Sequence, residues 1–199
     1  MAGRIRTGIG GWVYEPWRGS FYPSGLRQKD ELAYVGEHLT ATEVNATYYS
    51  SQKPAPFANW AKAVPDGFQF AVKASRYCTN RKILAEAGES IARFTGQGIA
   101  ELGDRLGPIL WQFMPTKRFD PDDFSAFLKL LPDAVDGVRL RHALEVRHES
   151  FDDPAFLDMA KAAGAAVVNW TVMSKIAASW VISPLLGAIV AAMFLSFIK

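Results

Sequence analysis

Cysteine is nearly absent from this chain, which has only Cys78 among 199 residues. A single cysteine permits neither an internal disulfide nor a cysteine-rich metal cluster, and it fits a reducing compartment. The amino terminus lacks the apolar stretch of a cleaved signal peptide, so we expect none. A formal net charge of +2 is too small to indicate nucleic acid as a partner, and we expect no nucleic-acid binding.

Charged residues are also missing from residues 176–198, which lie between Lys175 and Lys199. At about 1.5 Å per residue, a helix of this length spans a hydrocarbon core of about 30 Å. We therefore predict a transmembrane helix and membrane association through this segment. The alternative is an apolar helix buried against the preceding domain. Because more lysines precede the segment than follow it, we expect a cytoplasmic domain anchored to the membrane at its carboxyl terminus.

Before that segment, short apolar runs alternate with helical patterns. Two helices have clear start signals, since Asp120 and Asp153 each precede a proline. Strict alternation with short connections indicates an α/β fold of parallel strands, either a doubly wound sheet or a (β/α) barrel. The predicted strands span residues 4–10, 41–47, 68–74, 107–113, 142–148 and 165–169, and the predicted helices 29–39, 54–64, 86–102, 121–131 and 154–163.

Polar residues follow the apolar part of several predicted strands, and this favours the barrel. In a parallel barrel, functional groups gather where the strands end and the following loops begin. Residues two apart project from one face of a strand, which applies to two pairs here. A buried interior accepts such groups only when they pair with each other or with a ligand. The residues concerned are Glu43 with Asn45, Lys73, Gln112, and Glu145 with Arg147.

Five runs, in order and with matching spacing, resemble the YecE-like family, domain of unknown function 72. They are GIGGWVYEPWRGSFYPSGL (8–26), TEVNATYY (42–49), FQFAVKASRYCTN (68–80), LGPILWQFMPTKRFDP (106–121) and LEVRHESF (144–151). The resemblance covers about residues 4–168 and implies a TIM-barrel-like fold without an established reaction. By likeness it places a site at Trp12, Tyr14, Trp17, Arg18, Glu43, Asn45, Lys73, Glu145, Arg147 and His148.

After Val168 the chain departs from that pattern. The run KIAASWVISPLLG resembles a transmembrane segment of the inorganic phosphate transporter family. A single helix cannot form an alternating-access pathway, so we infer no transport. The two resemblances predict a join near residues 168–170, with an incomplete barrel domain at 1–168 and a hydrophobic helix at 169–199. A barrel truncated after about six strands leaves open edges, and we expect these to favour self-association.

The cations among the candidate residues favour an anionic small-molecule ligand bearing phosphate or carboxylate. They are Lys73, Arg76, Arg147 and Arg18, and Gln112 and Asn45 can add hydrogen bonds. The aromatic residues Trp12, Tyr14 and Trp17 offer faces on which a ring can stack, or they form a hydrophobic lid.

Glu43 and Glu145 are candidates for general acid and base, with His148 as a proton carrier near neutral pH. Structural ion pairs of Glu43 with Lys73 and of Glu145 with Arg147 are the alternative. The two glutamates and His148 could also hold a divalent metal, but no tight ligand spacing supports one. We predict an anion-binding domain without metal or cofactor and leave open whether it is an enzyme. The competing hypothesis is an inactive, membrane-anchored fusion.

Overall fold

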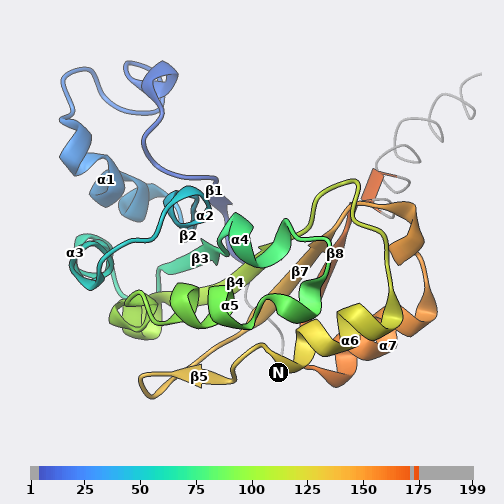
Figure 1. Cartoon of the computed structure of the whole chain (residues 1–199). Coiled ribbons are helices and arrows are strands. Elements are labelled where there is room, and N and C mark those ends of the chain that lie inside the picture. The colour runs from blue at the N-terminus through green and yellow to red at the C-terminus, as the bar shows by residue number, and fades with distance from the viewer. Residues whose placement is uncertain (1–4, 171–172, 175–199) are drawn as a thin grey trace, which may run out of the picture.

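The computed structural model describes residues 5–170, 173 and 174. Its main sheet has six parallel strands, each paired with the next one along this list: β1 (Gly8–Ile9), β2 (Ala41–Val44), β3 (Gln69–Lys73), β4 (Leu106–Gln112), β7 (His142–Val146) and β8 (Ala166–Asn169). Strand order follows chain order, as in a (β/α) barrel, whereas a doubly wound sheet reverses direction midway. The sheet curls into a half-barrel (Figure 1), which confirms the TIM-barrel-like expectation.

The α-helices are α1 (Glu31–His38), α2 (Ala46–Tyr49), α3 (Pro54–Ala63), α4 (Arg76–Thr79), α5 (Gly88–Thr95), α6 (Pro121–Lys129) and α7 (Pro154–Ala162). The five predicted helices are present in the predicted order as α1, α3, α5, α6 and α7, whereas the single turns α2 and α4 were not predicted. The shorter 3-10 helices are η1 (Glu15–Trp17), η2 (Gln28–Asp30), η3 (Leu84–Glu86), η4 (Ile99–Arg105) and η5 (Glu149–Phe151). Both predicted caps are present, since Asp120 accepts from the backbone N–H groups of Asp122 and Asp123, and Asp153 from that of Ala155.

Three predicted elements had wrong bounds, and one pair of strands was missed. The first strand, predicted over 4–10, spans only Gly8–Ile9 within the described residues. The strand predicted to reach residue 47 ends at Val44, because the chain turns into α2 at Asn45. The helix predicted over 86–102 is interrupted after Thr95, where Gly98 has a φ of 106° and lies close to Pro54. An antiparallel hairpin of β5 (Ala134–Val135) and β6 (Val138–Arg139) was missed, although its Asp-Gly turn has the positive φ angles typical of such hairpins.

The hydrophobic core lies between the sheet and the helices. Alternate residues of each strand face this core, as the two-residue period of a strand requires. They include Val44 in β2, Val72 in β3, Trp111 in β4 and Val146 in β7, all essentially inaccessible to solvent. Large aromatic side chains fill the layer under α6 and α7, where Phe113, Phe124, Phe127, Phe151 and Phe156 pack edge to face. The residues between the core-facing positions on each strand therefore point to the opposite, inner face of the half-barrel.

The predicted transmembrane segment, residues 176–198, lies outside the described residues. Within the part of the chain that the structure describes, no helix combines the length and hydrophobicity needed to cross a bilayer. At the predicted join, β8 extends through Asn169, which pairs with Val146 of β7.

Candidate functional site

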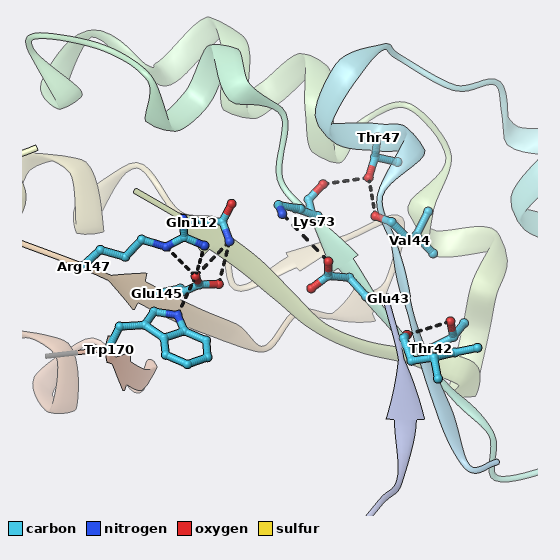
Figure 2. Close-up of polar contacts among 10 residues, drawn as sticks. Thr42, Glu43, Val44, Thr47, Lys73, Gln112, Glu145, Arg147 and Trp170 are labelled. Atoms are coloured by element: carbon cyan, nitrogen blue, oxygen red, sulfur yellow. Dashed lines mark hydrogen bonds and ion pairs between the residues drawn. The ribbon is translucent and has the colours of Figure 1, made fainter. Parts of the chain in front are cut away.

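Five polar side chains, which we call the polar cluster, gather on the inner face of the half-barrel: Glu43, Lys73, Gln112, Glu145 and Arg147 (Figure 2). The first four lie within or at the end of β2, β3, β4 and β7, and Arg147 follows β7 directly. The strand register brings Gln112 level with Glu145. Because the carboxyl ends of parallel strands meet at one edge of the sheet, residues far apart in sequence form one site.

Glu145 is the centre of the hydrogen-bond network. Its Oε1 accepts from Nε and Nη2 of Arg147, at 2.9 and 2.7 Å, and from Nε1 of Trp170 at 2.7 Å. The Gln112 amide nitrogen lies 2.9 Å from both carboxylate oxygens. The Glu145 side chain is only 8% exposed, whereas that of Arg147 is 37% exposed. This carboxylate is buried but well supplied with donors, as a buried charge requires.

Glu43 and Lys73 form a looser pair on the other side of the cluster. The Lys73 Nζ lies 3.9 Å from Oε1 of Glu43, and the two side chains are 15% and 25% exposed. The same Nζ lies 5.1 Å from the ring centroid of Tyr48, a cation–π distance. The hydroxyl of Thr47 donates to the Lys73 carbonyl oxygen at 2.7 Å, which ties α2 to β3. Lys73 is thus held in place without being saturated by its carboxylate partner.

The pKa values of the two glutamates are shifted in opposite directions. Burial raises the pKa of Glu43 above its ordinary value, and the charge of Glu145 adds to this, against the effects of Lys73 and Asn45. Burial alone would also raise the pKa of Glu145, but the donors Gln112, Arg147 and Trp170 together hold it below its ordinary value. Glu43 is therefore the carboxyl group of the cluster that more readily carries a proton.

Asn45 lies beside the cluster but not on β2. It is the residue before α2, so the expected same-face relation with Glu43 along one strand does not hold. The Asn45 side chain still contacts Glu43 and helps to lower its pKa. The prediction that Asn45 lies next to Glu43 is therefore correct, but the turn into α2, and not a shared strand face, brings the two together.

The candidates of the first loop pack elsewhere. Trp12 meets Trp60 of α3 edge to face, with 5.2 Å between ring centroids. Tyr14 lies 5.1 Å from Trp17, and Trp17 in turn packs against Phe21, which precedes α1. Arg18 donates from Nε to the fully buried Glu31 carboxylate at 2.8 Å. These contacts anchor the loop to the helices, so the structure does not bring this group into the network around Glu145.

His148 and Arg76 lie after β7 and β3 without joining the Glu145 network. The Nδ1 atom of His148 accepts from the backbone N–H of Ser150 at 3.1 Å and so caps η5. Arg76 is exposed on α4, with its guanidinium 5.3 Å from the centroid of the Tyr77 ring. Of the three residues predicted to transfer protons, the structure groups Glu43 and Glu145.

Two functional candidates escaped the sequence analysis. Trp170 was assigned to the hydrophobic tail, yet its indole donates to Glu145. Tyr48 was part of a quoted run but received no role, and it packs against Lys73. A signal for Trp170 existed only in its position directly after a strand, where barrel sites collect residues. Among residues 5–170, 173 and 174, no group of three or more His, Cys, Asp or Glu side chains is placed to hold a metal ion.

A separate groove of about 1020 Å³ lies outside the polar cluster, between residues 80–85 and residues 114–126. Its central ion pair joins Lys117 Nζ to Asp123 at 2.9 Å, and Asp123 also accepts from the backbone N–H of Ala85 at 2.9 Å. These contacts fasten η3 and the loop after β4 to the first turn of α6. We therefore interpret this ion pair as a structural brace.

Known proteins match the chain in two different ways. The UPF0759 protein YunF of Bacillus subtilis is 24% identical over 159 residues, which is 77% of this chain and 54% of YunF. A 38-residue stretch is 60% identical to a putative phosphate permease of Helicobacter pylori, but this is 19% of the chain and only 7% of the permease. The short match agrees with the phosphate-transporter resemblance.

Solved structures share the fold. Two crystal structures of a DUF72 family protein from Enterococcus faecalis V583 match with TM-scores of 0.60 and 0.65 at 22% identity. They cover 81% and 82% of this chain, which spans 61% and 60% of theirs. The family described as "Protein of unknown function DUF72" matches residues 6–189, and with the shared fold this shows that the chain belongs to the DUF72 family.

Proposed function

We propose that the polar cluster binds the anionic group, phosphate or carboxylate, of a small molecule. The observation that carries this proposal is the convergence of Lys73 and Arg147 on one face of the half-barrel (Figure 2). Neither cation is fully enclosed by its carboxylate partner, because Lys73 is 3.9 Å from Glu43 and Arg147 is 37% exposed. Ammonium and guanidinium groups are the donors that proteins use for such anions.

The opposite pKa shifts of the two glutamates support different roles for them at this site. Glu145 stays ionised and orients the Arg147 guanidinium through two hydrogen bonds. Glu43, whose pKa is raised, is the group suited to exchange a proton with a bound ligand. In an enzyme, Glu43 would act as the general acid or base, and in a binding module it would only complete the site.

Calorimetric titration of the full chain with inorganic phosphate and a panel of phosphorylated and carboxylated small molecules tests the binding proposal. We expect saturable binding that weakens at least ~10-fold in Lys73→Ala and in Arg147→Ala, since each removes a charged hydrogen bond worth about 1.5 to 3 kcal/mol. Lys62→Ala in α3 and Arg139→Ala in β6, both exposed and outside the cluster, are the matched controls. Equal losses in the controls, or no binding by the parent chain, would refute the proposal.

Turnover separates an enzyme from a binding module. For any ligand that binds, Glu43→Gln keeps the shape of the site but removes the titrating group. Loss of turnover with retained affinity would assign Glu43 to catalysis, whereas binding without any turnover in the parent chain would identify a binding module.

A second candidate, an inactive self-associating chain, is favoured by the open sides of the sheet. In the described part of the chain, β1 pairs only with β2, and β8 pairs only with β7. Parallel edge strands with free backbone groups can pair with another copy. Sedimentation of the full chain across a concentration series would show association at the concentrations used for the ligand panel, and a monomer there would remove this candidate.

A further inference from the structure

Three tyrosines and one arginine lie on the two helical turns that follow β2 and β3, and we call them the tyrosine cluster: Tyr48, Tyr49, Arg76 and Tyr77. Of these, Tyr48 contacts Lys73. The two turns are α2 and α4, and they lie next to each other (Figure 1). The Tyr48 hydroxyl accepts from the Asn80 side chain at 3.1 Å, which joins the two turns. The tyrosine cluster therefore borders the polar cluster at the carboxyl ends of neighbouring strands.

The rings of this group are unusually open to solvent. Tyr49 is 65% exposed and Tyr77 is 61% exposed. Tyr49 meets the Tyr48 ring edge to face at 5.0 Å, and Tyr48 in turn covers the Lys73 ammonium at 5.1 Å. Burying large aromatic faces is favourable, so two exposed rings on the turns that adjoin Lys73 and Tyr48 are a surface that a ligand could cover.

Arg76 completes the surface. Its guanidinium lies 5.3 Å from the Tyr77 ring centroid and is exposed. Contact with Tyr77 also raises the pKa of Arg76 above its ordinary value, so the guanidinium stays charged. A permanent cation among aromatic faces is the combination that proteins use to hold a flat ring attached to an anionic group.

We propose that the ligand of this half-barrel carries a flat ring next to its anionic group, with the anion at Lys73 and Arg147 and the ring on Tyr49 and Tyr77. This inference rests on the proposed function, because it names the class of compound that the polar cluster takes. Two kinds of ring fit this chemistry. A nucleobase is flat and would stack through its π face. A sugar ring is puckered and would instead pack one C–H face on the tyrosines.

The test compares ligands that share a phosphate but differ in the ring. Calorimetric titrations of the full chain would use inorganic phosphate, glucose 6-phosphate, and the nucleoside monophosphates AMP and UMP. We expect at least one ring-bearing phosphate to bind at least ~10-fold more tightly than phosphate alone. Tighter binding of AMP or UMP would assign a base, and tighter binding of glucose 6-phosphate a sugar.

Variants at exposed positions locate the ring without disturbing the core. Tyr49→Ala and Tyr77→Ala should each remove most of the ring-dependent gain and leave phosphate affinity unchanged. Tyr49→Phe and Tyr77→Phe should keep the gain, since the ring face remains. Tyr14→Ala, at a 51% exposed tyrosine of the first loop, should have no effect. Circular dichroism of each variant would establish that it is folded.

The outcomes separate this inference from the proposed function. Equal affinity for phosphate and for every ring-bearing phosphate would overturn the inference while leaving anion binding intact. A ring-dependent gain that is lost in Tyr14→Ala but kept in Tyr49→Ala and Tyr77→Ala would also overturn it, by placing the ring at the first loop. Failure of every phosphate and every other anion to bind would overturn both.

Discussion

The indole Nε1 of Trp170 donates a 2.7 Å hydrogen bond to Oε1 of Glu145, which joins the end of the described sheet to the centre of the polar cluster. Trp170 is 49% exposed as a whole residue, whereas Glu145 as a whole residue is 6% exposed. The exposed aromatic side chain therefore covers a buried carboxylate and supplies one of its donors.

Trp170→Phe should destabilise the chain by about 1 to 3 kcal/mol, since the variant keeps an aromatic ring but removes a donor to a buried charge. The free energy of unfolding in urea, followed by circular dichroism, measures this. The loss should shrink in a Glu145→Gln background, where the acceptor carries no charge. An equal loss in both backgrounds would show that ring packing, and not the hydrogen bond, is responsible.

Glu43→Gln and Glu145→Gln should change the pH dependence of stability in opposite directions. The folded-state pKa of Glu43 is raised above the unfolded value of about 4.3, so this residue's stabilising contribution is lost as pH rises through the folded pKa. Glu43→Gln should therefore gain stability relative to the parent chain as pH increases from about 4 towards 7.

The folded-state pKa of Glu145 is lowered, so its contribution is present above the unfolded pKa and is lost as pH falls through the folded value. Glu145→Gln should accordingly fall further behind the parent chain as pH rises from the folded pKa towards the unfolded value of about 4.3, and the difference should level off above that value. Urea unfolding of both variants at stepped pH measures the two differences. Curves that run parallel to that of the parent chain would contradict the opposite directions of the two pKa shifts.

The chain should lose stability in mild acid, because protonation of the partly buried His142 removes the acceptor of its hydrogen bond with Trp111. Nδ1 of His142 accepts from Nε1 of Trp111 at 3.0 Å, while Nε2 contacts the Pro132 carbonyl oxygen at 3.0 Å. Burial lowers the pKa of His142, against the opposing effects of Pro132 and Asp133. The stability from this lowered pKa is present above the unfolded pKa of about 6.5 and is lost as pH falls through the folded value.

His142→Gln retains a donor and an acceptor but does not titrate, so its thermal midpoint should fall less than that of the parent chain between pH 7.5 and pH 5. Scanning calorimetry at the two pH values gives the comparison. If the parent chain and the variant lose the same amount, another group controls the acid sensitivity.

Cys78 should be unreactive in the folded chain. It is completely buried, and burial raises the pKa of its thiol to about 12, so almost no thiolate forms at neutral pH. Ellman's reagent should label one thiol per chain in guanidinium chloride and very little without it. Rapid labelling of the native chain would mean that the region around α4 opens readily.

The apolar segment 176–198 is proposed to hold the chain in a membrane with its preceding domain in the cytoplasm. We expect the full chain to float with vesicles on a density gradient and to resist carbonate extraction. Leu186→Arg combined with Val190→Arg should abolish flotation, because each charge near the centre of a span costs about 2.5 to 3.5 kcal/mol on insertion scales. Flotation of this double variant would exclude insertion through residues 176–198.

Local patterns in the sequence were sufficient to predict, in order, the six strands of the main sheet and the five longer α-helices. Apolar alternation placed the six strands of the sheet, and the Asp120 and Asp153 caps placed two helix starts. These features depend on backbone sterics and on neighbours within a few residues, so they can be recognised in a single chain. The resemblance then identified the family, which its match over residues 6–189 shows.

Contacts between distant residues required the tertiary structure. The sequence placed Glu43, Lys73, Gln112 and Glu145 at strand ends, but only the register and the curl of the sheet decided that Glu145 meets Gln112 and Trp170 while Glu43 meets Lys73. The direction of each glutamate's pKa shift follows from those donors and from burial, which no local pattern encodes. For the same reason the aromatic side chains of the first loop were expected at the site but pack against the helices, whereas Tyr48 and Tyr77 stand beside Lys73 and Arg76.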